Sequence, residues 1–151
     1  MTLTQKETSL LEDLKSQEQL CIEKYTKYAA NACDPCLSGL FGTIKATEEG
    51  HLQTINKILS GESVSATTPP TAVSQKFTCE KSSCEPMAKQ NDAYLCRDAL
   101  AMEKHVSSIY DMSIFEFSSP ELRDVLSHIQ KEEQNHGEQL YNYLSANGMY
   151  N

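Results

Sequence analysis

The amino-acid sequence repeats itself at a separation of 85 residues, without any gap between the two copies. Some of the shared residues are apolar or turn positions that any helical hairpin requires, but shared Glu and His residues are not explained in that way. The repeat therefore predicts two helical hairpins related by a pseudo-two-fold axis. The identical pairs include Leu10/Leu95, Asp13/Asp98, Glu18/Glu103, Tyr25/Tyr110, Pro35/Pro120, Leu37/Leu122, Ile44/Ile129, Glu48/Glu133, His51/His136, Leu59/Leu144 and Ser60/Ser145.

Four segments have apolar residues at the spacing of an α-helix, and no segment alternates as a strand does. Two of them begin with a capping side chain followed by proline, at Asp34-Pro35 and Ser119-Pro120. Two end just before a glycine, Gly61 or Gly148, as helices commonly do. The predicted helices span 4–31, 35–60, 88–117 and 120–146.

Residues 61–86 are rich in Ser, Thr and Pro and differ in composition from the helical segments. A connection of this length inside a compact domain needs a structural reason. A crossover supplies one, since such a segment is long enough to span the length of the helices. We therefore expect a single all-α domain over 1–151, a ferritin-like four-helix bundle in which hairpins 4–60 and 88–146 are joined by this crossover.

Both halves contain the motif Glu-x-x-His at the same place in the repeat. Residues three apart lie on one face of a helix, and in both halves that face is the apolar one. The first helix of each hairpin also places a Glu on its apolar face, 30 residues before the Glu of the motif. Because both positions lie at about the same distance from the turn between them, the rise of about 1.5 Å per residue puts them at one level. The side chains expected to meet at mid-bundle are Glu18, Glu48, His51, Glu103, Glu133 and His136.

Four buried carboxylates would be strongly destabilising if nothing compensated their charge. Two divalent cations provide that compensation, and four carboxylates with two imidazoles suit iron or manganese, with the central pair of glutamates bridging the two ions. We therefore predict a dimetal site, for which zinc is a further option. Tyr25 lies two turns after Glu18 on the first helix, and Tyr110 lies two turns after Glu103 on the third. Both are expected to donate hydrogen bonds to the site. The alternative is a relic site whose carboxyl groups are protonated or salt-bridged.

The other charged residues near these motifs have simpler interpretations. His105 and His128 lie off the apolar faces and are expected at the surface. Glu49, Glu132 and Glu138 are expected to be solvated charges on helix faces.

Net charge and hydropathy exclude some classes of partner. The chain has a formal net charge of −8, which argues against nucleic-acid binding because that requires clustered Lys and Arg. No stretch approaches the roughly 18–20 apolar residues of a membrane span. Residues 1–8 are polar, so we expect no signal peptide and synthesis in the cytosol.

Six cysteines are a high number for a chain without a predicted leader. In the expected topology, the turn after the first helix and the start of the third helix lie at the same end of the bundle. Four cysteines should gather there, as a structural zinc site, as two disulfides or as cross-links between molecules. These four are Cys33, Cys36, Cys79 and Cys84. The remaining two, Cys21 and Cys96, lie on helix faces and are expected to be small buried apolar residues.

Several segments resemble known families. The six-residue set resembles the di-iron and dimanganese carboxylate bundles of the ferritin-like superfamily, and segment 18–25 resembles the first helix of rubrerythrin. Val106 stands three residues after Glu103, where rubrerythrin has a further glutamate, and the sequence contains no rubredoxin module. A closer resemblance is to the Coat F-type spore coat proteins of clostridia and bacilli. It is carried by segments 20–28, 91–98, 114–117, 129–137 and 147–150.

The Coat F resemblance implies a structural protein of the spore coat or exosporium, synthesised in the mother-cell cytoplasm. Its implied partners are other coat proteins or further copies of itself. Because a coat matures outside the reducing cytosol, the resemblance favours disulfides, within or between molecules, for the four clustered cysteines. The alternative function is a dimetal oxidoreductase, peroxidase-like or manganese-catalase-like, that removes peroxide at the spore surface. Metal storage is a third interpretation, but the sequence gives no sign of the cage that it requires.

Overall fold

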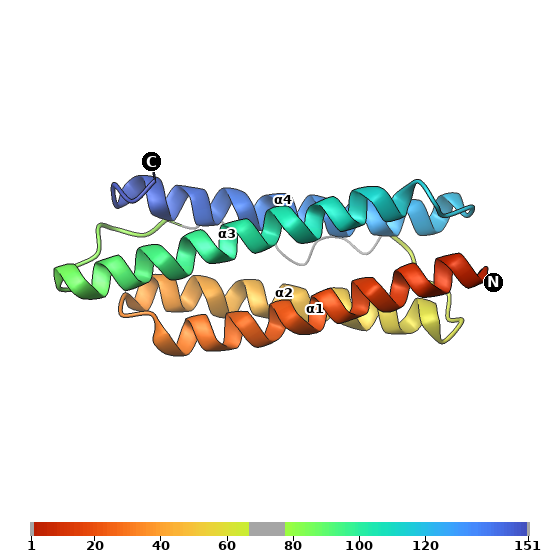
Figure 1. The fold of residues 1–151 in the computed structure, drawn as a ribbon, viewed down its shortest axis with the longest axis horizontal. Helices are drawn as coiled ribbons and strands as arrows, with labels where there is room; N and C mark the ends of the chain where they lie inside the picture. The colour runs from red at the N-terminus through yellow and green to blue at the C-terminus, as the bar shows by residue number, and fades with distance from the viewer. Residues whose placement is uncertain (1, 67–77, 151) are drawn as a thin grey trace.

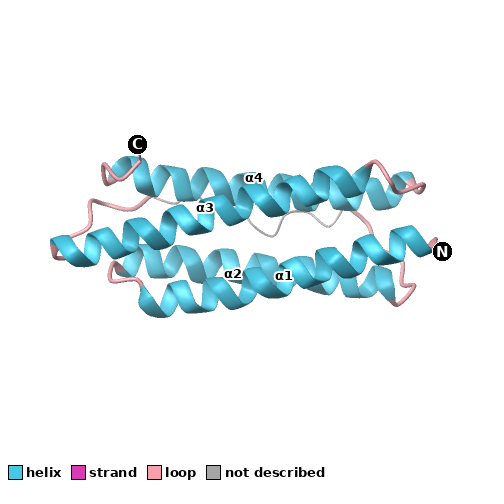
Figure 2. Cartoon of the chain, viewed as in Figure 1, coloured by secondary structure: helices cyan, strands magenta, loops and turns pink. Residues whose placement is uncertain are grey.

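The structure is a computed structural model that describes residues 2–66 and 78–150. Within these ranges the chain forms four helices and no strands (Figure 2). The predicted all-α four-helix bundle is therefore confirmed. None of the described helices has the length and apolar character needed to cross a membrane. The helices are α1 (Gln5–Asn31), α2 (Pro35–Leu59), α3 (Pro86–Ile114) and α4 (Pro120–Ala146).

The two hairpins lie side by side along their full length (Figure 1). Helix α1 is antiparallel to α2, and α3 is antiparallel to α4, whereas α2 and α3 run in the same direction. The end of α2 and the start of α3 therefore lie at opposite ends of the bundle. Part of the predicted crossover, residues 67–77, lies outside the described residues. The α1–α2 turn, the start of α3 and the end of α4 share one end of the molecule (Figure 1).

The helix ends follow the predicted start and stop signals. The side chain of Asp34 accepts a hydrogen bond from the first turn of α2, and the side chain of Ser119 does the same for α4. Gly61 and Gly148 have φ values of 84° and 64°, which only glycine adopts without strain. Proline occupies the first turn of three helices, where its missing N–H would have no partner inside the helix.

Helix α3 differs from its predicted bounds of 88–117. It begins at Pro86, two residues earlier, because proline suits the first helical position. It ends at Ile114, and Phe117 lies in the following turn although its side chain is buried. Phe117 continues the apolar spacing of α3, and the sequence pattern therefore predicted a helix that extends beyond its end at Ile114.

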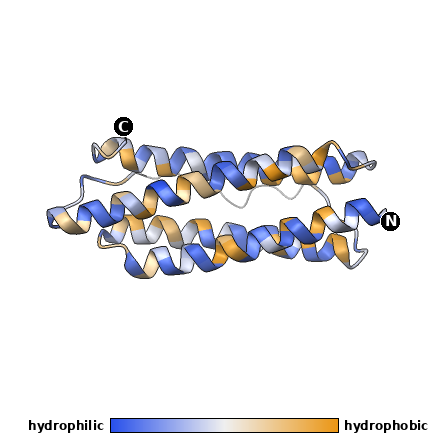
Figure 3. Ribbon diagram, viewed as in Figure 1, coloured by the Kyte–Doolittle hydropathy of each residue, from blue (hydrophilic) through white to orange (hydrophobic). Residues whose placement is uncertain are grey.

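The core is formed by the apolar face of each helix, seen as orange segments between blue ones along the ribbons of Figure 3. Its largest fully buried side chains include Tyr25, Phe41, Tyr110 and Tyr143. Cys21 and Cys96 are free thiols within this core, as predicted.

Two buried carboxylates hold the turns of the bundle, each from the opposite hairpin. Glu7 of α1 accepts hydrogen bonds from the backbone N–H (2.9 Å) and the hydroxyl (3.0 Å) of Ser118, in the α3–α4 turn. Asp92 of α3 accepts from the backbone N–H groups of Cys33 (2.8 Å) and Asp34 (2.9 Å), in the α1–α2 turn. Glu7 and Asp92 are equivalent positions of the 85-residue repeat, and so are Cys33 and Ser118. The pseudo-two-fold repeat is thus present in the contacts between the hairpins.

The four clustered cysteines form two disulfides within the chain. Cys33 is bonded to Cys84, and Cys36 to Cys79. The bridges fasten the segment before α3 to the α1–α2 turn and to the first turn of α2, which confirms the predicted gathering of thiols at this end. Of the alternatives, the structure has intramolecular disulfides, so these sulfur atoms are not ligands for zinc.

Candidate metal centre

Six polar side chains meet in the middle of the bundle, and they are the six that the repeat predicts. Each belongs to the apolar face of its helix, so the packing that buries the neighbouring Leu, Ile and Tyr side chains also buries these groups. All six are at most 5% exposed. They are Glu18 of α1, Glu48 and His51 of α2, Glu103 of α3, and Glu133 and His136 of α4.

The six side chains form two overlapping groups of four. In each group, one candidate ligand atom per residue lies within 4.8 Å of the others. Glu48 and Glu133 belong to both groups, so each can contribute to two neighbouring positions. The first group is completed by Glu18 and His51, and the second by Glu103 and His136.

Both imidazoles point Nδ1 into the cluster. Nδ1 of His51 lies 2.9 Å from Oε2 of Glu48 and 3.3 Å from Oε1 of Glu133. Nδ1 of His136 lies 3.3 Å from Oε2 of Glu133 and 3.5 Å from Oε1 of Glu103. A deprotonated Nδ1 has a lone pair directed at these carboxylates, where a cation would bind.

Each of the four glutamates has one buried side-chain oxygen that accepts no hydrogen bond among the described residues. A buried carboxylate oxygen without a partner is costly, and such groups in folded proteins call for an ion or water. The atoms that accept no hydrogen bond are Oε2 of Glu18, Oε1 of Glu48, Oε2 of Glu103 and Oε1 of Glu133. Of these, Oε1 of Glu133 and Oε1 of Glu48 lie 3.3 Å and 3.4 Å from the imidazole Nδ1 atoms of His51 and His136. The donor set therefore fits one or two divalent cations.

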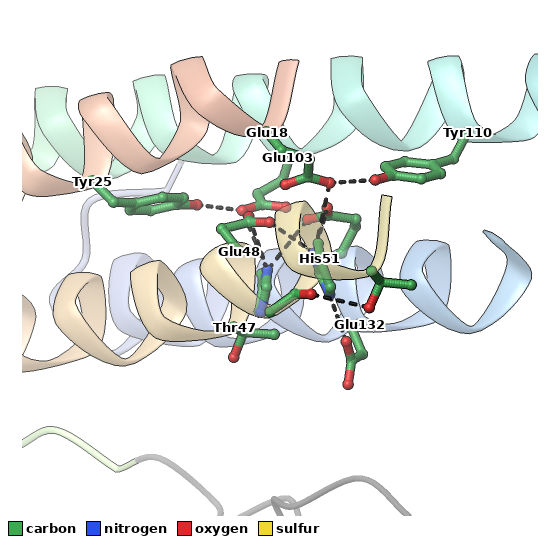
Figure 4. Close-up of polar contacts among 12 residues, drawn as sticks. Glu18, Tyr25, Thr47, Glu48, His51, Glu103, Tyr110 and Glu132 are labelled. Atoms are coloured by element: carbon green, nitrogen blue, oxygen red, sulfur yellow. Dashed lines mark hydrogen bonds and ion pairs between the residues drawn. The ribbon is translucent and has the colours of Figure 1, made fainter. Parts of the chain in front are cut away.

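Two tyrosines point at the cluster from opposite sides (Figure 4). The Tyr25 hydroxyl donates to Oε1 of Glu103, and the Tyr110 hydroxyl donates to Oε1 of Glu18. Each tyrosine thus orients the carboxylate of the other hairpin. Burial and the adjacent glutamate raise the pKa of Tyr25 and Tyr110 well above the usual range, which keeps both hydroxyls protonated as donors.

Burial and mutual repulsion divide the carboxyl groups into two kinds. Burial and the neighbouring glutamates raise the pKa of Glu18 well above its usual value, and burial also raises the pKa of Glu103. Burial alone would raise the pKa of Glu133, but the Glu103 carboxyl and the two imidazoles lower it well below its usual value. Burial opposes protonation of His51, yet hydrogen bonds to the surrounding carboxylates raise its pKa. Burial thus favours the protonated form of Glu18 and Glu103, whereas Glu133 is favoured in its ionised form.

Glu132 corrects one prediction from the sequence. It was expected to be a solvated charge, but its Oε2 lies 2.5 Å from Nε2 of His51, and its side chain is only 25% exposed. His128 was expected at the surface; it is half-buried, with Nε2 3.4 Å from Oε1 of Glu132. Glu49, Glu138 and His105 are exposed, as predicted.

The second hairpin is similar to a known protein family. Residues 91–151 match the family model of the Coat F domain. The match begins in α3 and includes all of α4. No curated protein and no solved structure matches the chain.

Proposed function

We propose that this chain is a structural spore coat protein whose ferritin-like bundle holds two divalent metal ions, iron or manganese, in its core. The Coat F match supports the coat role. One observation carries the metal proposal: four buried glutamates each have an oxygen that accepts no hydrogen bond, and they form with two buried histidines two groups whose candidate ligand atoms lie within 4.8 Å of one another.

The arrangement of donors supports a pair of ions rather than one. Glu18 with His51, and Glu103 with His136, are the terminal ligands in this proposal, while Glu48 and Glu133 bridge the two positions. A Glu from each of two helices and a Glu-x-x-His from each of the other two is the ligand pattern of ferritin-like di-iron and dimanganese proteins. Four carboxylates balance two dications, so the loaded core would be neutral.

Within this proposal the protein belongs in the spore coat or exosporium, with other coat proteins or further copies of itself as partners. The metal ions stabilise the bundle by neutralising the buried carboxylates. The two disulfides suit an environment outside the reducing cytosol.

Metal analysis of protein stripped with chelator and reloaded with Mn²⁺ or Fe²⁺ tests the proposal. We expect two ions per chain in the wild type and none in the double variant Glu48→Gln with Glu133→Gln, which keeps the side-chain shapes. Because His51 and His136 lose ion-pair partners in this variant, circular dichroism should verify that the metal-free double variant is folded. Glu49→Gln, an exposed neighbour on α2, is the matched control and should load as the wild type does.

The metal proposal fails if wild-type protein binds neither ion, or if the double variant loads as well as the control. Peroxide consumption by the loaded protein then separates a structural role from a peroxidase-like or catalase-like one. A loaded protein that leaves peroxide untouched supports the structural function.

A further inference from the structure

The two metal positions have almost the same ligands but different surroundings. Residue 132 precedes the bridging Glu133, and the equivalent residue before Glu48, 85 positions earlier, is residue 47. These residues are Glu132 and Thr47, so one half of the repeat has a carboxylate where the other has a hydroxyl. Both lie below the cluster in the view of Figure 4, on the side away from Tyr25 and Tyr110.

The carboxylate contacts only one of the two imidazoles. Oε2 of Glu132 lies 2.5 Å from Nε2 of His51, the ring nitrogen that faces away from the cluster. The Thr47 hydroxyl instead donates to the backbone carbonyl of Thr43, at 3.5 Å. Within the part of the chain that the structure describes, no hydrogen bond reaches Nε2 of His136.

A carboxylate on the outer nitrogen changes an imidazole ligand in three ways. It holds the proton on Nε2, which leaves the lone pair on Nδ1 for the metal. It fixes the orientation of the ring, and it increases the electron density of the ligand atom. Loss of such a partner typically lowers metal affinity by about ten- to hundredfold. His51 has this partner and His136 does not.

We propose that the two positions are inequivalent, with a tightly held ion at Glu18 and His51 and a weaker, exchangeable ion at Glu103 and His136. This inference rests on the proposed function, because it requires that the centre bind metal. Glu132 is the positioning residue that creates the difference. Its second oxygen, 3.4 Å from Nε2 of His128, is held by a side chain of the same helix.

Titration of chelator-stripped protein with Mn²⁺, following free Mn²⁺ by electron paramagnetic resonance, tests the inference. The wild type should take up two ions in two steps whose dissociation constants differ by about ten- to hundredfold. Glu132→Thr, which copies the residue of the other half, should weaken the tight step and merge the two. Thr47→Glu should tighten the weak step. Glu138→Gln removes a charge from an exposed position of α4 and should leave both steps unchanged.

Variants of the ligands assign the steps. His136→Ala should abolish the weak step and keep the tight one, and His51→Ala should do the reverse. Two equal steps in the wild type, or an unchanged separation in Glu132→Thr, would overturn the inference while the dimetal proposal stands. Absence of Mn²⁺ binding in the wild type would overturn both.

Discussion

The two disulfides should stabilise the fold by an amount that depends on how many of them are present. Both bridges close nearly the same loop, with sequence separations of 51 and 43 residues. In the chain-entropy account, either bridge alone restricts an unfolded loop of this size and contributes about 4 kcal/mol. Once one bridge is formed, the second bridge closes only a short loop, which consists of residues 33–36, residues 79–84 and the first bridge. Its further contribution is about 2–3 kcal/mol.

Removal of one bridge should therefore cost less than half of what removal of both costs. We expect about 2–3 kcal/mol for Cys33→Ser with Cys84→Ser, or for Cys36→Ser with Cys79→Ser, and about 6–7 kcal/mol for all four substitutions. At about 2–4 °C per kcal/mol for a chain of this size, the single-bridge variants should melt about 4–12 °C lower. None of the four side chains is fully buried, so serine itself adds little to the loss.

Thermal and urea unfolding under non-reducing conditions measure these differences, with thiol labelling to verify which bridges are present. The four-serine variant is the control for reductant, since dithiothreitol should lower the melting temperature of the wild type and leave the variant unchanged. Equal losses for one bridge and for both, or no loss on reduction, would refute the loop-entropy reasoning.

Two further predictions concern titratable groups. The backbone N–H groups of Thr4 and Ser118 lower the pKa of Glu7 below its usual 4.5, so its carboxylate stabilises the fold above that pH, and the contribution is lost as the pH falls through the lowered value. Glu7→Gln should therefore lower the free energy of unfolding by about 1–3 kcal/mol at neutral pH. Urea unfolding should show that this difference disappears in acid. A difference that persists in acid would contradict the stabilising role of the ionised Glu7 carboxylate. Because burial raises the pKa of Glu18 and Glu103, metal must displace protons, and Mn²⁺ affinity should decrease as pH is lowered. Calorimetry in two buffers of different ionisation enthalpy measures this release, and identical heats would count against it.

The sequence was informative where helical periodicity alone determines position. The rise per residue and the matched distances from the turns put Glu18 at the level of Glu48, and Glu103 at the level of Glu133, without any knowledge of side-chain contacts. The structure brings these four residues together with both imidazoles. Whether the cluster holds metal stays a prediction. The ends of α1, α2 and α4 were also predictable to within one residue, because capping side chains, prolines and glycines mark most of them.

Contacts between helices were not accessible in the same way. Successive helical residues are rotated by about 100°, so Glu132 turns away from the face that carries Glu133 and the pattern assigns it to solvent. Only the approach of α2 to α4 brings the His51 ring within reach. The disulfide pairing was equally hidden, since four cysteines allow three connectivities and spacing does not choose among them. The available signal for Glu132 was the difference from Thr47 within an otherwise matched motif.

The contacts between the hairpins have the form of an isologous interface, in which every interaction occurs twice with the roles exchanged. The Tyr25 hydroxyl donates a hydrogen bond to Glu103 of the other hairpin, and the Tyr110 hydroxyl donates the equivalent hydrogen bond to Glu18. In a dimer of two identical hairpins, any substitution would appear on both sides of the axis. Joining the hairpins in one chain removes that constraint, so one half can change while its counterpart stays the same. The carboxylate beside His51 has no copy in the other half, an asymmetry that a dimer of identical hairpins could not encode.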